Sequence, residues 1–168
     1  MKPFLSQELT QPNTMQKVLK ILPPENALRE LNNLLYSSGF DYFPIQKVED
    51  INKKYKFDVR AKFKKETAKL LEDFAEYHLN QELPNDGSRF IPKLVEILAI
   101  ETKKADDILT EIRSRIYRKR FELAVVNRRL SEEEETILET LRVNLGLDEE
   151  KEEEISIKVK SNAIQSYV

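Results

Sequence analysis

The chain has 168 residues, with 28 lysines and arginines against 30 aspartates and glutamates, and a formal net charge of −2. This length suits one compact domain with a single hydrophobic core. The sequence contains no cysteine, which excludes disulfides, thiolate metal sites and cysteine nucleophiles. Its three glycines lie far apart, so it lacks the clustered glycines of a phosphate-binding loop or a dinucleotide-binding fingerprint.

No segment has the composition of a membrane span. The longest apolar stretch, Leu94 to Ile100, is interrupted by Glu96 and is far shorter than the ~20 residues that cross a bilayer. No apolar run follows Lys2, so no signal peptide is predicted. Together with the absence of cysteine, these features favour a soluble, cytoplasmic protein.

The N-terminal region begins without a regular pattern. Residues 1–13 contain two prolines and no sustained periodicity, which predicts a flexible arm with Phe4 and Leu5 as docking points. The apolar residues after it predict a short helix from Met15, closed by two prolines. A second helix is predicted over residues 25–38, because its leucines fall on one stripe ahead of a glycine that suits a C-terminal cap.

Two further helices are predicted before the middle of the chain. The first begins after Pro44, and the second is a long helix capped by Asp58 that continues to about Gln81. Turn-forming residues around positions 84–88 then predict a break, which is the point where the domain would be subdivided. On the long helix, one face is expected to carry Val59, Phe63, Leu70, Phe74 and Tyr77.

The next segment is the most apolar of the chain. Seven of the ten residues from Ile91 to Ile100 are apolar, so we expect a helix over residues 89–100 to be the central, most buried one. Because the run is short, a buried strand is the alternative. A long helix is predicted over residues 102–127, with its inward face formed by Ala105, Ile108, Leu109, Ile112, Ile116, Phe121, Leu123 and Ala124.

The clearest helix start in the sequence is a capping box at Ser131 and Glu134. A last helix is predicted from Asp148 to about Val159, although residues 155–159 also alternate as a short strand would. The apolar stripe of the capped helix is expected to comprise Ile137, Leu138, Leu141 and Leu145.

These elements together predict an all-α fold. We expect a single-domain bundle of about seven or eight helices over residues 14–160, followed by a tail at 161–168. Its C-terminal part is expected to be an acidic helical hairpin, because residues 132–154 hold eleven acidic and two basic residues.

Basic residues are concentrated in two other segments. Residues 53–69 hold eight basic and two acidic residues, and residues 113–129 hold seven and one. A nucleic-acid interpretation uses these helices as phosphate contacts. The alternative, which the net charge of −2 favours, is that the cations cover solvated helix faces and neutralise the acidic hairpin. The residues proposed for phosphate contact are Lys62, Lys64, Lys65 and Lys69, with Tyr55, Phe57 and Tyr117 for base stacking.

His78 is the single histidine, and its surroundings argue against a metal site. A di-iron bundle needs a glutamate three residues before it, where Ala75 lies, and Glu82 supplies only one further ligand. We therefore predict an ordinary helix-surface histidine, no metal and no cofactor. The carboxylate pairs at 72–73 and 106–107 point about 100° apart and are predicted to face solvent.

Residues 117–155 combine a long helix, the sequence Leu130-Ser131-Glu-Glu-Glu134, an Ile/Leu-rich helix, Leu145-Gly146-Leu147 and another acidic helix. This order resembles the helical hairpin of TerB-like tellurite-resistance domains and of related repeats in a chloroplast inner-envelope translocon protein. The resemblance covers about a quarter of the chain and implies an all-helical interaction module. In TerB-like domains an acidic Asp-Gly element before the capped helix is associated with metal binding. Here Asn127-Arg128-Arg129 stands in that place, which puts metal binding in doubt.

We expect a non-catalytic interaction, scaffold or accessory protein that binds a protein partner, or another copy of itself, through charged helix faces. An enzyme is not expected, because no set of residues indicates a catalytic geometry. The alternative is a nucleic-acid-associated accessory subunit of a nucleoprotein complex. The predicted contact residues are the basic Arg113, Arg115, Arg118, Lys119 and Arg120 and the acidic Glu132, Glu133, Glu149 and Glu150.

Overall fold

The computed structural model describes residues 5–37, 45–80, 89–125 and 130–165. These residues form nine helices and no strand, which confirms the predicted all-α bundle. In chain order the helices are α1 (Thr14–Leu19), α2 (Glu25–Ser37), α3 (Ile45–Tyr55), α4 (Val59–Lys62), α5 (Lys64–Leu79), α6 (Ile91–Ile97), α7 (Thr102–Ala124), α8 (Glu132–Leu145) and α9 (Glu149–Gln165).

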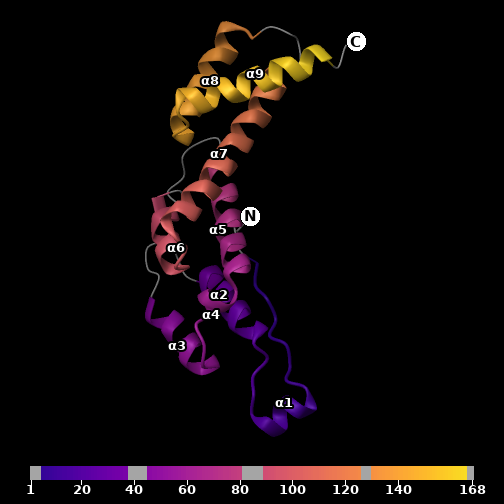
Figure 1. The fold of residues 1–168 in the computed structure, drawn as a ribbon, viewed down its shortest axis with the longest axis vertical. Coiled ribbons are helices and arrows are strands. Elements are labelled where there is room, and N and C mark those ends of the chain that lie inside the picture. Colours follow the sequence, from indigo (N-terminus) through magenta and orange to yellow (C-terminus); the bar gives the residue numbers. More distant parts are fainter. Residues whose placement is uncertain (1–4, 38–44, 81–88, 126–129, 166–168) are drawn as a thin grey trace.

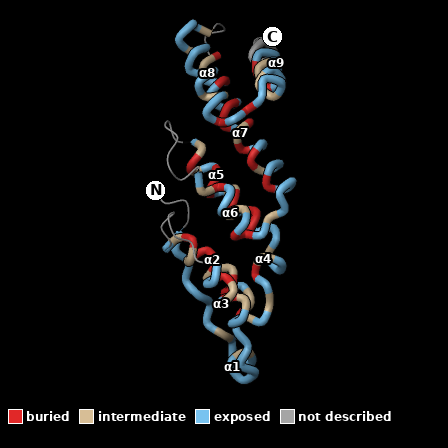
Figure 2. Tube along the Cα trace, turned by 90° about the vertical axis from the view of Figure 1, so that its left-hand side faces the viewer, coloured by how far each residue is buried: buried red, intermediate tan, exposed pale blue. Residues whose placement is uncertain are grey.

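The bundle is elongated, and α7 connects its two halves (Figure 1). Helices α3 and α4 pack on α2 at one end, whereas α8 and α9 pack on α7 at the other. Between them, α5 packs on α7. Buried residues form one hydrophobic cluster that extends from Ala27 on α2 to Val159 on α9, and α1 lies outside it (Figure 2).

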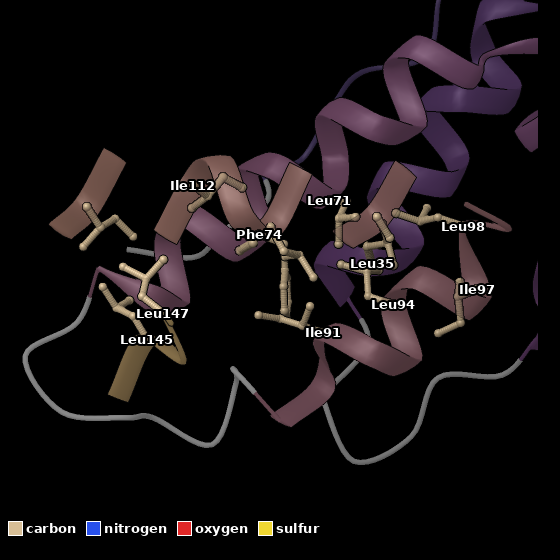
Figure 3. Packing of buried hydrophobic residues seen from close by; sticks show 14 of the residues in the cluster. Leu35, Leu71, Phe74, Ile91, Leu94, Ile97, Leu98, Ile112, Leu145 and Leu147 are labelled. Carbon is tan, nitrogen blue, oxygen red and sulfur yellow. The ribbon is translucent and has the colours of Figure 1, made fainter. Parts of the chain in front are cut away.

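Helix α6 is shorter and less central than the sequence predicts. It covers residues 91–97 of the expected 89–100, and it is helical rather than a strand. Figure 3 shows Leu94 of α6 beside Leu71 of α5 and Leu35 of α2, all members of the core cluster. The prediction that this is the central helix is wrong, because α7 packs against α5, α8 and α9 whereas α6 packs chiefly on α5.

The predicted long helix from Asp58 is two helices. Asp58 caps α4 by accepting hydrogen bonds from the backbone N–H groups of Arg60 and Ala61, at 2.8 and 3.3 Å. Phe63 then has φ −114° and ψ 48°, outside the helical region, and this residue separates α4 from α5. Helix α5 ends at Leu79, and the predicted end at Gln81 lies outside the described residues, as does the break at 84–88.

Residues 5–13 lie extended beside α2 and are attached to it by asparagine side chains. The amide of Asn26 accepts from the N–H of Thr10 and donates to the carbonyl of Thr10, both at 2.8 Å. Asn33 forms the same pair with Gln7, at 2.7 and 2.6 Å. Each asparagine therefore binds both polar groups of one residue, as a neighbouring strand would.

The other contacts of this segment also use its main chain. The carbonyl groups of Leu5 and Glu8 accept hydrogen bonds from the side chains of Asn32 and Arg29, each at 2.6 Å. The side chain of Leu5, a predicted docking point, is 71% exposed. The second predicted docking point, Phe4, lies outside the described residues.

The capping box that starts α8 forms as predicted. The hydroxyl of Ser131 accepts from the backbone N–H of Glu134 at 3.2 Å, and the Glu134 carboxylate accepts from the N–H of Ser131 at 2.8 Å. Gly146 ends the helix with φ +66°, a left-handed conformation that favours glycine.

Helix α9 continues well beyond its predicted end at Val159, to Gln165. Residues 155–159, the alternative strand, are helical, and so are residues 161–165 of the predicted tail. Ile155 and Val159 are four residues apart and 1% and 5% exposed, which is the spacing of a buried helical face.

Candidate protein-interaction surface

The basic residues predicted for partner binding are spread around α7. Arg118 and Lys119 are exposed and form no ion pair with any residue that the structure describes. Arg115 is also exposed, but it pairs with Glu76 of α5 at 3.0 Å. Two of the five instead turn toward the C-terminal hairpin: Arg113 and Arg120.

The four predicted acidic contacts separate into two pairs. Glu132 and Glu133 lie in the first turn of α8, and Glu149 and Glu150 lie in the first turn of α9; all four are exposed. The 14 residues of α8 place these turns about 20 Å apart along the hairpin. The structure thus forms two acidic surfaces, each at a helix N-terminus where the helix dipole favours negative charge.

An open groove of about 540 Å³ lies where the end of α5, the last turns of α7 and one face of α8 meet. Leu123 of α7 and Ile137 of α8 line it and remain 63% and 59% exposed. Arg120 and Glu134 contribute opposite charges to its wall. The rest of the apolar lining includes Leu79, Ala124 and Leu141. We call this site the α7/α8 groove.

The groove corrects the sequence prediction, which placed Leu123 and Ile137 in the core. Leu123 follows the buried Ile116 by two helical turns and points in nearly the same direction. Helix α5, which packs on α7, ends at Leu79, and the described residues leave Leu123 largely uncovered. On α8, the buried Leu138 lies on the α7 side, about 100° around the helix from Ile137. The apolar stripes are wider than the faces that neighbouring helices cover.

The two charges of the groove are held differently. Glu134 accepts hydrogen bonds from the backbone N–H and the hydroxyl of Ser131, and these lower the pKa of its carboxyl group. Arg120 forms no ion pair with the described part of the chain. The groove therefore combines an apolar floor with a fixed anion and an available cation.

The lysines proposed as phosphate contacts are not equivalent. Lys62 lies over the ring of Phe57, with Nζ 4.2 Å from the ring centroid. Lys69 pairs with two carboxylates of α5 at 3.3 and 2.9 Å, and these hydrogen bonds raise its pKa. Lys64 and Lys65 are exposed and form no ion pair among the described residues.

Tyr117 does not offer a ring for base stacking, contrary to prediction. Its side chain is 2% exposed, and its hydroxyl donates to Glu152 of α9 at 3.2 Å. Tyr55 is half-buried and donates to Glu30 of α2 at 2.8 Å. Burial and then the neighbouring carboxylate raise the pKa of both phenols well above the usual value.

His78 is buried rather than on the surface, which corrects the prediction. It is 4% exposed and lies against the rings of Phe74 and Tyr77, at centroid distances of 4.4 and 4.9 Å. Glu82 lies outside the described residues. Within the described ranges, no group of three or more His, Cys, Asp or Glu side chains is placed to hold a metal ion.

No helix in the described part of the chain is long and apolar enough to cross a membrane. The resemblance of residues 117–155 to TerB-like domains stays a prediction. No protein-family model, no curated protein and no solved structure matches the chain.

Proposed function

We propose that this protein is a non-catalytic interaction module that binds a helical segment of a protein partner in the α7/α8 groove. The observation that carries the proposal is the exposure of Leu123 and Ile137 in a concave apolar site. Grooves of this kind accept the apolar face of an amphipathic helix, with a few central side chains supplying most of the affinity.

The charged residues around the groove fit a role in orienting the partner. Arg120 and Glu134 line the groove, and Glu132 and Glu133 lie beside Glu134 in the first turn of α8. Exposed charges at the edge of an interface act mainly on the association rate and on the choice of partner. Of the predicted contact residues, Arg120, Glu132 and Glu133 are therefore assigned to the edge of the site, and the apolar groove forms its centre.

The proposal is tested by quantitative capture from the native lysate with the tagged full chain, after nuclease treatment. Ile137→Asp places a charge in the groove and should reduce capture of the bound protein roughly tenfold or more, as hot-spot substitutions do. Val143→Asp is the matched control, because Val143 is 61% exposed on the same helix and does not line the groove. Equal capture by the two variants would reject the groove as the binding site.

The contribution of the edge charges is measured separately. Arg120→Glu should weaken capture while leaving helicity unchanged. Arg118→Glu is the matched control, because Arg118 is exposed on the opposite side of α7 from the groove-lining Arg120. Partners that are lost on nuclease treatment, with nucleic acid that co-purifies through Lys64 and Lys65, would instead support the nucleic-acid alternative.

A further inference from the structure

Helix α1 is an apolar element with no contact to the core. It has no buried residue, and the side chains of Met15, Val18 and Leu19 are 72%, 76% and 58% exposed. These three residues follow the i, i+3, i+4 spacing and so lie on one helix face. Ile21 and Leu22, 51% and 37% exposed, extend the apolar surface beyond the helix end. We call this surface the α1 tip.

The α1 tip is held in a defined conformation although none of its helical residues is buried. At its start, Asn13 and Gln16 form a capping box, with bonds of 2.8 and 2.9 Å. At its end, Lys20 adopts φ +52°, and the N–H of Ile21 donates to the carbonyl of Gln16 at 2.9 Å. An isolated helix of six residues is unstable in water, so these caps prepare the tip for contact.

The base of the loop that carries α1 is also closed. Asn26 of α2 binds the N–H and carbonyl of Thr10, and its own N–H donates to the carbonyl of Pro23 at 3.0 Å. Asn26 therefore binds both the start and the end of the loop that carries α1. Figure 1 shows α1 at the end of the molecule opposite to α8 and α9.

The α1 tip and the floor of the α7/α8 groove are both apolar. The charge of the tip is opposite to that of the α8 wall, whereas Arg120 on the α7 wall has the same sign as the tip. The tip offers one turn of apolar helix, and the groove exposes Leu123 and Ile137. Residues 13–22 contain Lys17 and Lys20 and no acidic residue, whereas the first turn of α8 holds four glutamates. Opposite charges at the edge of an apolar contact steer association and fix its orientation.

We propose that the α1 tip of one copy occupies the α7/α8 groove of a second copy. This inference rests on the proposed function and names its partner as a further copy of the chain. The tip does not reach the groove of its own molecule, because the two lie at opposite ends of the elongated bundle (Figure 1). Depending on the rotation between copies, this contact either closes, as in an antiparallel pair that fills both grooves, or leaves a tip and a groove free for further copies.

The absence of cysteine makes a direct test possible. The full chain is prepared as two single-cysteine variants, Val18→Cys and Ile137→Cys, which are mixed and oxidised with diamide. The mixed disulfide between the two variants should form roughly tenfold faster than the one between Val18→Cys and Val143→Cys, since docking raises the effective thiol concentration. Val143 is the matched control, equally exposed on α8 but outside the groove lining. Equal rates for the two pairs would overturn the proposal.

A second measurement uses light scattering of the unlabelled chain over a range of protein concentrations. The wild type should increase in average mass with concentration, and Val18→Asp or Ile137→Asp should remain monomeric. A mixture of these two variants should form a one-to-one dimer and nothing larger, because only one tip and one groove remain intact.

Two outcomes would overturn the self-docking inference. One is a wild type that stays monomeric at every concentration while Ile137→Asp still loses its captured partner; the proposed function would then stand without it. The other outcome requires a vesicle-binding measurement in addition. A wild type that stays monomeric but binds vesicles of anionic lipid, and loses this binding in Val18→Asp, would assign the tip to a membrane surface.

Discussion

The two ends of the molecule each attach an additional segment to a helix, and they do so with different forces. At the N-terminal end, residues 5–13 are attached to α2 by hydrogen bonds from side chains to main-chain atoms. At the C-terminal end, α9 is attached to α7 mainly by apolar side chains such as Ile155 and Val159.

The difference has energetic consequences. A hydrogen bond contributes a net ~0.5–1.5 kcal/mol, because both partners also bond to water in the unfolded chain. Burying a large apolar side chain contributes ~1.5–3 kcal/mol, and this contribution is not directional. The N-terminal attachment therefore specifies register and opens readily, whereas the C-terminal attachment is stronger and less specific. The first two predictions below each alter one of these attachments, and the other two alter a helix cap and a pair of tyrosines.

The largest effect is expected at the C-terminal end. Ile155→Ala removes a side chain that is 1% exposed and should lower the free energy of unfolding by ~2–5 kcal/mol in urea denaturation. Ile157→Ala on the same helix is the control. Because the side chain of Ile157 is 61% exposed, this substitution should change the free energy of unfolding little. Similar losses for both would show that α9 is not anchored on this face.

At the N-terminal end, Asn26→Ala removes both hydrogen bonds to Thr10. It should lower the free energy needed to detach residues 5–13 from α2 by ~1–3 kcal/mol. The effect should be local, so hydrogen exchange should accelerate in residues 5–13 and remain unchanged in α8 and α9. Asn33→Ala should have a smaller effect, because water replaces this exposed pair more easily. Faster exchange throughout the chain would contradict an independent attachment.

An intermediate effect is expected for the cap of α8. Ser131→Ala removes the hydroxyl that accepts from Glu134 and should cost ~1 kcal/mol in thermal or urea unfolding. Ser131→Asp retains an acceptor at this position and should restore most of the stability. If both variants matched the wild type, the capping box would contribute nothing to the hairpin.

The smallest effect depends on pH and is expected at both ends. Tyr55 near α2 and Tyr117 near α9 both have a pKa raised by burial and a neighbouring carboxylate. Their contribution to stability is complete below the unfolded-state pKa near 10 and is lost as the pH rises above it, because the unfolded chain then binds fewer protons. The free energy of unfolding should fall as the pH rises above about 10 toward the raised pKa values of the folded state, and Tyr55→Phe and Tyr117→Phe should each reduce the fall. An unchanged pH dependence in both would exclude the tyrosines as its source.

Local signals in the sequence predicted much of the helical fold, and long-range contacts account for most of the differences. The capping box at Ser131 and the end of α8 at Gly146 follow from short-range rules, and both are observed. The bonds from α2 to residues 5–13 join positions that are 16 to 27 residues apart and have no periodic signal. Phe63 interrupts an apolar pattern that continues on both sides of it.

The sequence prediction selected charged residues, of which only Arg120 lines the α7/α8 groove. The groove itself depends on where α5 ends relative to Leu123, and no local pattern gives that. The burial of His78 had a signal, because it lies four residues after Phe74 and seven after Leu71 on the apolar face of α5. The prediction placed His78 on the surface because histidine is a polar residue. The strand alternative at 155–159 arose because Ile155 and Val159 suit either period.

The asparagine contacts of α2 also determine which sequence changes the N-terminal segment tolerates. Asn26 and Asn33 bind the amide and carbonyl groups of Thr10 and Gln7, groups that nearly every amino acid supplies. The side chains of this segment are therefore free to vary without loss of attachment. Proline is the exception at both positions, because it lacks the N–H group that donates a hydrogen bond to each asparagine.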